Sequence, residues 1–259
     1  MKDGSHQITV FETERVRAVC HNPDRARLSV SFDYLRRTRE GFPGKPPSQR
    51  FLAAGHAHLI VETAQNDWFL SPDLPNLRGA LHDFTAGYDD VAAMGFSLGG
   101  YGALLMSRAL HLRRVLLVSP QYSIFAAKVP FERRYRKYAA VLDPELDDIV
   151  AQGNAELAGA VLFDPLLHPN DALHAALVRE AFPGLQAVAM PFGGHPALGL
   201  INEAKLFGKV QALMTEPEIS AQAVHMLRRR ARAATPGYFK RVQKYLKRRE
   251  AAAAQAPDD

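Results

Sequence analysis

The stretch VAAMGFSLGGYGALL, residues 91–105, places a serine between glycines where an apolar run meets a helical one. Within it, GFSLG at residues 95–99 fits the pattern G-x-S-x-G, which forms a sharp turn between a strand and a helix. Small residues two places before and after the serine relieve crowding in such a turn. Ser97 is therefore predicted to stand above the edge of a sheet as a nucleophile.

The helix that follows the serine is expected to direct its N-terminus at the site. The backbone amide of Leu98 is then able to donate a hydrogen bond to a developing oxyanion. The pattern G-x-S-x-G is weak alone and becomes more specific between a strand and a helix. The alternative is a glycine-rich turn that carries an incidental serine.

The rest of the chain alternates short β-rich runs with helical stretches. This alternation predicts an α/β fold with a mostly parallel sheet covered by helices on both faces. The expected strands cover residues 6–13, 26–35, 57–63, 89–96, 113–120, 156–164 and 185–192. Helices are expected at residues 77–88, 97–112, 169–182, 218–234 and 235–254.

Together, this order of elements and the segment GFSLGGYGAL, residues 95–104, resemble the α/β-hydrolase superfamily of serine hydrolases. The segment is similar to the nucleophile turn of bacterial carboxylesterases and S-formylglutathione-hydrolase-like esterases. The resemblance covers residues 8–215. It implies an α/β-hydrolase domain at residues 1–216, with a small cap inserted at residues 126–156. Residues 217–259 are expected to form a separate basic helical extension.

The superfamily carries its nucleophile, acid and histidine in that chain order. His195 follows the last apolar run, in a loop with two glycines, where the resemblance implies the catalytic histidine. Asp164 ends the preceding apolar run and is predicted to be the acid. Asp171 lies seven residues later, and either Asn170 or Asp171 is interpreted as the N-cap of a helix. The alternative for His195 is a turn histidine without a role. The alternative for Asp164 is a strand-terminating Asp-Pro turn.

The second oxyanion donor is expected from an amide near Phe32 or Asp33, although the HG or HGGG motif of many hydrolases is missing here. Asp33 has two other interpretations, a ligand for a substrate hydroxyl or a helix cap. Tyr34, Trp68 and His168 are further candidates for the substrate pocket. Trp68 is equally compatible with packing in the core.

The predicted cap contains PFERRYRKYAAVL, residues 130–142, in which basic and aromatic side chains alternate. One interpretation is that these residues recruit an anionic substrate through the electric field and bidentate arginine contacts. The other is an ordinary solvated helix face.

Positive charge is concentrated near the C-terminus. Residues 228–249 hold ten Lys and Arg and no Asp or Glu, whereas the formal net charge of the whole chain is +5. This segment is expected to bind an anionic lipid surface, a nucleic acid or an acidic partner, although no recognised nucleic-acid motif is present. Alternatively, Tyr238, Val242 and Tyr245 dock the segment on the main domain, or the segment is an ordinary solvated and charged helical hairpin.

Composition limits the remaining classes of function. Cys20 is the only cysteine, so neither an internal disulfide nor a thiolate metal cluster is possible. The sequence has no phosphate-binding loop and no H-E-x-x-H motif, so neither a cofactor nor a metal is expected. Without a secretory signal or an apolar run of membrane-spanning length, the expected location is the cytoplasm.

The sequence therefore predicts a serine hydrolase that cleaves a small carboxylic ester or thioester. Ser97 forms the acyl-enzyme, His195 is the base and Asp164 orients the histidine. An acyltransferase with the same three residues is the alternative within enzymes. A non-catalytic interaction module with this fold, presented through its basic tail, is the alternative outside them.

Overall fold

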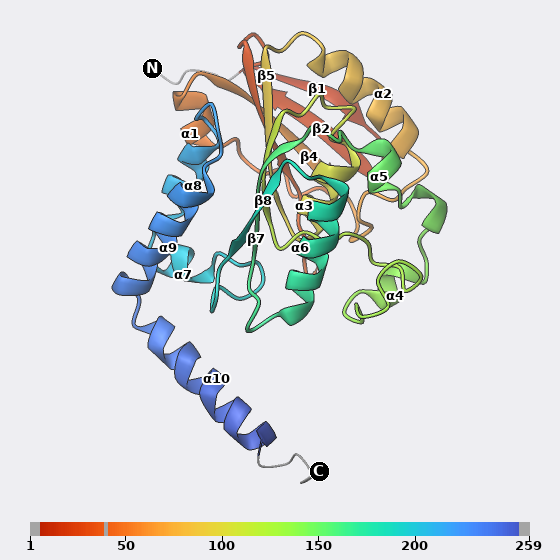
Figure 1. Ribbon diagram of the computed structural model, residues 1–259. Coiled ribbons are helices and arrows are strands. Elements are labelled where there is room, and N and C mark those ends of the chain that lie inside the picture. Colours follow the sequence, from red (N-terminus) through yellow and green to blue (C-terminus); the bar gives the residue numbers. More distant parts are fainter. Residues whose placement is uncertain (1–5, 39–40, 254–259) are drawn as a thin grey trace.

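A single eight-stranded sheet with helices on both faces forms the body of the molecule (Figure 1). The computed structural model describes residues 6–38 and 41–253. The strands are β1 (Gln7–Glu12), β2 (Val16–His21), β3 (Arg27–Phe32), β4 (His56–Thr63), β5 (Asp90–Phe96), β6 (Arg114–Val118), β7 (Ala158–Phe163) and β8 (Leu185–Ala189). Their order in the sheet is β1-β2-β4-β3-β5-β6-β7-β8.

Strand direction divides the sheet. β1 pairs antiparallel with β2, and β2 pairs antiparallel with β4. From β4 to β8 every neighbouring pair is parallel. The predicted mostly parallel sheet is confirmed. β2 was not among the expected strands, because its polar Arg17 interrupts a short apolar run.

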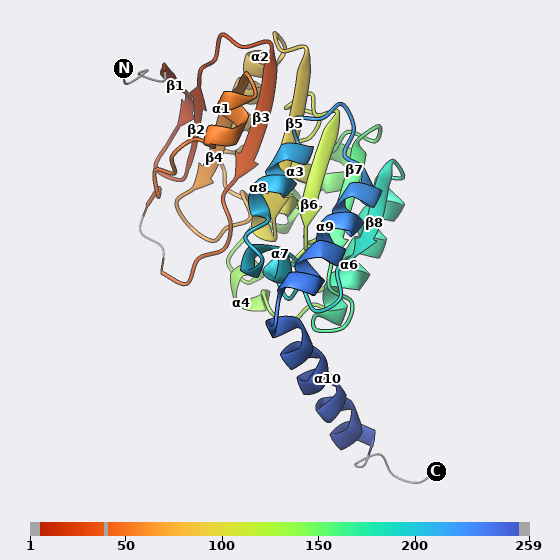
Figure 2. The same ribbon diagram turned by 90° about the vertical axis from the view of Figure 1, so that its left-hand side faces the viewer.

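The helices lie in two layers, one on each face of the sheet. They are α1 (Gln49–Ala53), α2 (Leu74–Thr85), α3 (Leu98–Leu105), α4 (Arg136–Ala139), α5 (Ile149–Gln152), α6 (Pro169–Ala181), α7 (Gly199–Glu203), α8 (Phe207–Leu213), α9 (Ala221–Ala234) and α10 (Gly237–Ala253), with a 3₁₀ turn η1 (Pro144–Leu146). Figure 2 shows α1, α7, α8 and α9 in front of the sheet, with α2, α3 and α6 behind it.

The central strands are buried on both faces, which explains their continuous apolar sequences. In β5, Val91 and Ala93 join the core beneath α2, α3 and α6. Ala92 and Met94 point the other way, into the core beneath α8 and α9. The two cores are therefore separated only by the sheet.

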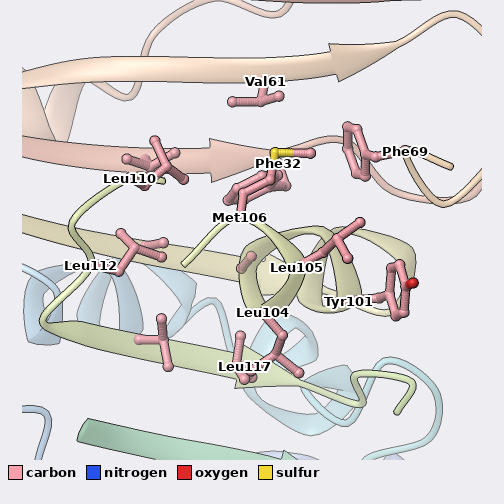
Figure 3. Close-up of a cluster of buried hydrophobic side chains, with 14 of the residues drawn as sticks. Phe32, Val61, Phe69, Tyr101, Leu104, Leu105, Met106, Leu110, Leu112 and Leu117 are labelled. Atoms are coloured by element: carbon pink, nitrogen blue, oxygen red, sulfur yellow. The ribbon is translucent and has the colours of Figure 1, made fainter. Parts of the chain in front are cut away.

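α3 is buried along its whole length. Figure 3 shows Tyr101, Leu104 and Leu105 of this helix among side chains from the neighbouring strands and loops. A Cβ atom on Gly102 would lie 2.5 Å from the ring of Phe69, so the close approach of this helix requires glycine there. The helix ends at Leu105 rather than at residue 112, because the chain turns where Ser107 Oγ donates to the carbonyl of Leu104.

The basic C-terminal segment divides into two parts. α9 places Val224, Leu227 and Ala231 in the same core as β8, so the predicted division after residue 216 does not follow a break in the packing. α10 continues beyond the body and projects away from it (Figures 1 and 2). Residues 254–259 of the predicted extension lie outside the described residues.

Over the described part of the chain, every helix is too short or too polar to span a membrane. Across residues 6–38 and 41–253, no group of three or more His, Cys, Asp or Glu side chains is arranged to hold a metal ion.

A buried histidine in β4 makes stability depend on pH. Burial, reinforced by the neighbouring His21, lowers the pKa of His58 to about 3. The amide of Ser48 donates to His58 Nδ1 at 3.0 Å, so Nε2 carries the proton and faces Ser31 Oγ at 2.8 Å. A second proton on Nδ1 would oppose the Ser48 amide hydrogen.

We predict that the free energy of unfolding falls as the pH decreases from 7 to 5. The unfolded chain takes up a proton on His58 below its ordinary pKa of about 6.5, whereas the folded chain does so only near 3. The expected loss from this residue is about 2 kcal/mol. Urea titrations at several pH values measure it. His58→Gln should flatten the dependence and the same change at exposed His225 should not; equal pH dependence in all three proteins would contradict the assignment.

Candidate active site

Ser97 lies in a strained turn between β5 and α3. Its φ of 50° and ψ of −117° are unusual for a residue with a side chain. Backbone atoms crowd this turn, because a Cβ on Gly95 would lie 2.4 Å from the carbonyl oxygen of Gly99. A Cβ on Gly99 would lie 2.3 Å from the carbonyl oxygen of Asp33. The glycines of the motif are thus required by close packing.

The structure brings Ser97, His195 and Asp171 together in one chain of hydrogen bonds. His195 Nε2 lies 2.9 Å from Ser97 Oγ, and His195 Nδ1 lies 2.7 Å from Asp171 Oδ2. A carboxylate only accepts hydrogen bonds, so Nδ1 carries the proton and Nε2 is free to accept one from the serine hydroxyl. Ser97 is 5% exposed, so the three groups interact largely away from water.

Asp164, the acid predicted from the sequence, does not contact His195. Its Oδ1 accepts hydrogen bonds from the amides of Leu166 and Leu167, and its Oδ2 accepts one from the amide of Gly194. The prediction that Asp164 orients the histidine is therefore wrong, because its carboxylate binds backbone amides and not the imidazole of His195. Asp164 instead holds the backbone of the connection that leads into α6 and of the loop that carries His195.

Asp171 was interpreted as a helix cap, and this interpretation is also wrong. The N-cap position of α6 is His168, and Asp171 is the third residue of the helix. The positive end of the helix dipole favours a carboxylate in this first turn. Burial raises the pKa of Asp171, but the hydrogen bond from His195 and the positive charge of Arg134 outweigh it and hold this pKa below its ordinary value.

The segment between β6 and β7 closes a ring of polar contacts on α6. Arg134 Nη2 lies 2.8 Å from Asp171 Oδ1, and Arg134 also binds both carboxylate oxygens of Glu132. Glu132 in turn accepts a hydrogen bond from His174 Nε2 at 3.0 Å. Burial alone raises the pKa of Glu132, but hydrogen bonds from His174 and Arg134 lower it to about 2. The ring therefore fixes this segment to the helix that carries Asp171.

A buried amide approaches Ser97 from the end of β6. Gln121 Nε2 donates to Ser97 Oγ at 3.2 Å and to the carbonyl of Ser119 at 3.1 Å. Trp68 Nε1 donates to Gln121 Oε1 at 3.1 Å. Because an indole nitrogen is only a donor, this contact fixes which end of the amide faces the serine.

Two aromatic side chains complete this wall of the site. Tyr135 Oη lies 3.3 Å from His195 Nε2. The ring of Trp68 packs against the rings of Tyr135 and Tyr138, with centroids 4.9 and 5.2 Å apart. Trp68 is fully buried and has a φ of 53°. It is therefore a core residue that also positions groups beside Ser97.

The predicted oxyanion donors differ in their availability. Among the described residues, no protein acceptor takes the amide hydrogen of Leu98, which remains available at the start of α3. The amide of Asp33 donates to the carbonyl of Val61 at 2.9 Å, which removes it as a candidate. Phe32 adjoins the turn, since a Cβ on Gly99 would lie 3.0 Å from Cβ of Phe32. The role of the Phe32 amide as the second oxyanion donor stays a prediction.

Asp33 is fully buried and its carboxylate is already neutralised. Its Oδ1 lies 2.8 Å from both Arg36 Nη2 and Lys45 Nζ, and it accepts a hydrogen bond from the amide of Tyr34. Tyr34 is exposed, with Lys45 Nζ 4.1 Å from its ring centroid. These contacts hold Asp33 in its loop, and its role as a ligand for a substrate hydroxyl stays a prediction.

His168, the remaining pocket candidate, lies beside His195, with ring centroids 5.7 Å apart. Burial, above all other influences, lowers the pKa of His168. Its neutral ring lies next to the candidate base. A role in the substrate pocket remains a prediction.

Sequence reasoning missed Gln121, Glu132 and His174. Gln121 follows the strand next to the serine strand, and a polar side chain at the carboxyl end of such a strand is a usable signal. His174 lies within α6, one turn after Asp171 on the same face, and this spacing is the signal that could have found it. Glu132 had no signal beyond being an acidic residue in a basic run.

Comparison with solved structures gives alignments over most of the chain. The capsule O-acetyltransferase of Neisseria meningitidis serogroup A aligns with a TM-score of 0.50 and 12% identity, over 80% of this chain and 94% of that chain. The glycosylation-associated Gap123 complex of Streptococcus agalactiae aligns with a TM-score of 0.55 and 14% identity, over 80% of this chain and 46% of that chain. An α/β serine hydrolase without a lid from Xanthomonas campestris aligns with a TM-score of 0.45 and 15% identity, over 83% of this chain and 97% of that chain.

The first two alignments each cover 80% of this chain, whose mostly parallel sheet carries the serine turn after β5. The chain has the α/β-hydrolase fold. The sequence itself matches no protein-family model and no curated protein. Identity with the solved structures is 15% or lower, so the likeness concerns the fold.

The ring of polar contacts on α6 is expected to contribute to the free energy of unfolding of this α/β-hydrolase fold. Arg134→Met leaves buried Glu132 and Asp171 without their shared cation and should lower the free energy of unfolding by about 3 kcal/mol. The double variant Arg134→Met with Glu132→Gln replaces both partners of this ion pair, and it should recover a large part of the lost free energy. Chemical denaturation measures both.

Arg133→Met is the matched control, because Arg133 is the exposed neighbour in the same segment. Equal stability of Arg134→Met and Arg133→Met would show that the ring contributes nothing to folding.

Proposed function

We propose that this chain is a serine hydrolase that cleaves a small carboxylic ester or thioester through an acyl-enzyme on Ser97. The observation that carries the proposal is the hydrogen-bonded series Ser97–His195–Asp171, at 2.9 and 2.7 Å. Distances in this range allow the base to accept the nucleophile's proton, while the carboxylate holds the base in the required tautomer.

The reaction proceeds in two halves. His195 Nε2 takes the proton of Ser97 Oγ as the oxygen attacks the acyl carbon, and the imidazolium then protonates the departing alkoxide or thiolate. In the second half, His195 takes a proton from the water that attacks the acyl-enzyme. It then returns this proton to Ser97 Oγ, which leaves as the acid is released. Asp171 stabilises the imidazolium in both halves without itself accepting the proton.

The tetrahedral intermediate requires donors for its oxyanion. The amide of Leu98 supplies one in this proposal, and the amide of Phe32 supplies the second. Gln121 contacts Ser97 from the end of β6, whereas Phe32 is the last residue of β3, on the other side of β5. We therefore assign Gln121 to orienting the serine hydroxyl before attack.

Contacts within the cap leave fewer of its basic side chains free for the predicted recruitment of an anionic substrate. Of its basic side chains, Arg134 is occupied by Glu132 and Asp171, and Lys137 covers the ring of Tyr138 at 4.8 Å.

We retain as proposals the cap at residues 126–156, the domain division after residue 216 and the cytoplasmic location. The substrate class proposed is a small acyl ester or thioester, without a charge requirement.

An acyltransferase is the second candidate, and one observation favours it. One solved structure aligned above is a capsule O-acetyltransferase, and that alignment covers 80% of this chain. Supplying an acyl ester with and without carbohydrate or simple alcohol acceptors separates the two, because a transferase yields a new ester instead of free acid.

Ser97→Ala should abolish ester hydrolysis and leave the fold intact, because it removes only the nucleophilic oxygen. Covalent labelling by a fluorophosphonate probe should be lost together with activity. Ser119→Ala, which removes another buried serine hydroxyl near the site, is the control and should still be labelled. Labelling of Ser97→Ala, or a lack of labelling in the unaltered protein, would contradict the proposal and favour a non-catalytic module.

Asp171→Asn should lower kcat by a factor on the scale of ~10⁴, because the amide no longer favours the required tautomer of His195. Asp164→Asn should act mainly on stability, since the Asp164 carboxylate receives only backbone amide hydrogens. Rates with a small chromogenic ester and melting temperatures of both variants test this. A larger rate loss in Asp164→Asn than in Asp171→Asn would refute the assignment of the acid.

A further inference from the structure

α10 has an exposed surface that the proposed reaction does not use. The helix carries six basic residues and one acidic residue between Gly237 and Ala253. Five of the basic side chains are exposed: Lys240, Lys244, Lys247, Arg248 and Arg249. Within residues 6–38 and 41–253, none of these five forms an ion pair with an acidic side chain. We propose that α10 docks this protein on an anionic lipid bilayer.

One side of α10 is already occupied by the body of the protein. Tyr238 and Tyr245 pack edge-on against Phe192, with ring centroids 5.6 and 5.7 Å apart. Arg241 donates to the carbonyl of Phe192 at 3.0 Å and pairs with Glu203 at 3.0 Å. The helix is therefore fixed at its N-terminal end, and its remaining faces project beyond the sheet (Figures 1 and 2).

The free faces combine positive charge with large apolar side chains. Phe239 is 64% exposed and Leu246 is 50% exposed. Seven residues separate them, so they lie on one stripe of the helix. Lys240 and Lys247 each follow one of them in sequence and flank this stripe. A helix with an apolar stripe bordered by lysines and arginines is the form that lies in the interface of a bilayer.

The apolar stripe favours a bilayer over the other anionic partners. A nucleic acid offers phosphates to the lysines but gives Phe239 and Leu246 no apolar layer to enter. A second copy of α10 would bring like charges together. An anionic bilayer satisfies both features, because its headgroups attract the cations and its acyl boundary accepts the two apolar side chains.

Docking by α10 would also orient the candidate active site. Phe192, on which α10 packs, is three residues before His195 in the same loop. The surface attached to the bilayer is thus joined directly to the loop of the candidate base. This inference is independent of the reaction proposed above, since binding does not require an active serine.

Sedimentation of the full chain with vesicles tests the proposal. Vesicles containing about one third phosphatidylserine should bind the protein, and pure phosphatidylcholine vesicles should not. Binding should weaken when salt rises from 50 to 500 mM, because the attraction is screened. The variant Lys240→Gln with Lys244→Gln should bind about 25-fold more weakly, at about fivefold for each charge near the surface.

Two control variants make the result specific. Arg25→Gln with Arg27→Gln removes the same charge from exposed positions outside α10 and should change vesicle binding less than twofold. Phe239→Ser with Leu246→Ser should weaken vesicle binding at least tenfold, while binding to a single-stranded oligonucleotide stays unchanged. Circular dichroism checks that each variant is folded.

Three results would overturn the proposal. The first is equal binding to neutral and anionic vesicles. The second is an equal loss of binding in the two charge variants, which would indicate attraction by net charge alone. The third is tighter binding to the oligonucleotide than to the vesicles together with insensitivity to the Phe239 and Leu246 changes, which would make α10 a nucleic-acid surface.

Discussion

The close approach of three backbone segments at the turn between β5 and α3 is the constraint on which the site depends. The φ of 50° at Ser97 costs of the order of 1–3 kcal/mol, and such strain persists only where the surroundings enforce it. Here Gly95, Gly99 and Gly100 let the turn lie against neighbouring backbone. Without this approach, Ser97 Oγ would not reach His195, and the amide of Leu98 would not lie next to it.

Two carboxylates support the histidine loop in different ways. Asp171 holds the imidazole, and it is itself held by Arg134 from the segment after β6. Asp164 holds the backbone of the loop through Gly194, just before His195. The loop is therefore fixed at its side chain by α6 and at its backbone by the end of β7. Both attachments depend on the same short connection between β7 and α6.

Sequence patterns predicted the sheet, the serine turn and the histidine loop, because each has a local signature. Apolar runs mark strands buried on both faces, and glycines mark the turns that backbone crowding demands. The acid was misassigned because Asp164 and Asp171 lie in one short stretch, and both interpretations used local rules. Which carboxylate reaches His195 depends on where α6 begins in space, and that is a tertiary property.

The groups around Gln121 and Arg134 were not predictable in the same way. Gln121 presents Nε2 to Ser97 because Trp68, distant in the sequence, and the carbonyl of Ser119 fix its amide. Arg134 lies in a run of basic residues, and only the fold selects it from its neighbours for Asp171. Contacts between residues far apart in the chain leave no periodic signal. The exposed cations of α10, in contrast, were visible from composition alone.

The glycines of the serine turn have a consequence for divergence among proteins of this fold. A substitution at Gly95 or Gly99 collides with backbone, which has no alternative rotamer to relieve the overlap. Most core positions of the sheet, in contrast, tolerate another apolar side chain of similar volume. Selection for the fold therefore acts strongly on very few positions and weakly on the rest. Two chains can then share this fold at 12% identity, as the comparison with the Neisseria structure shows.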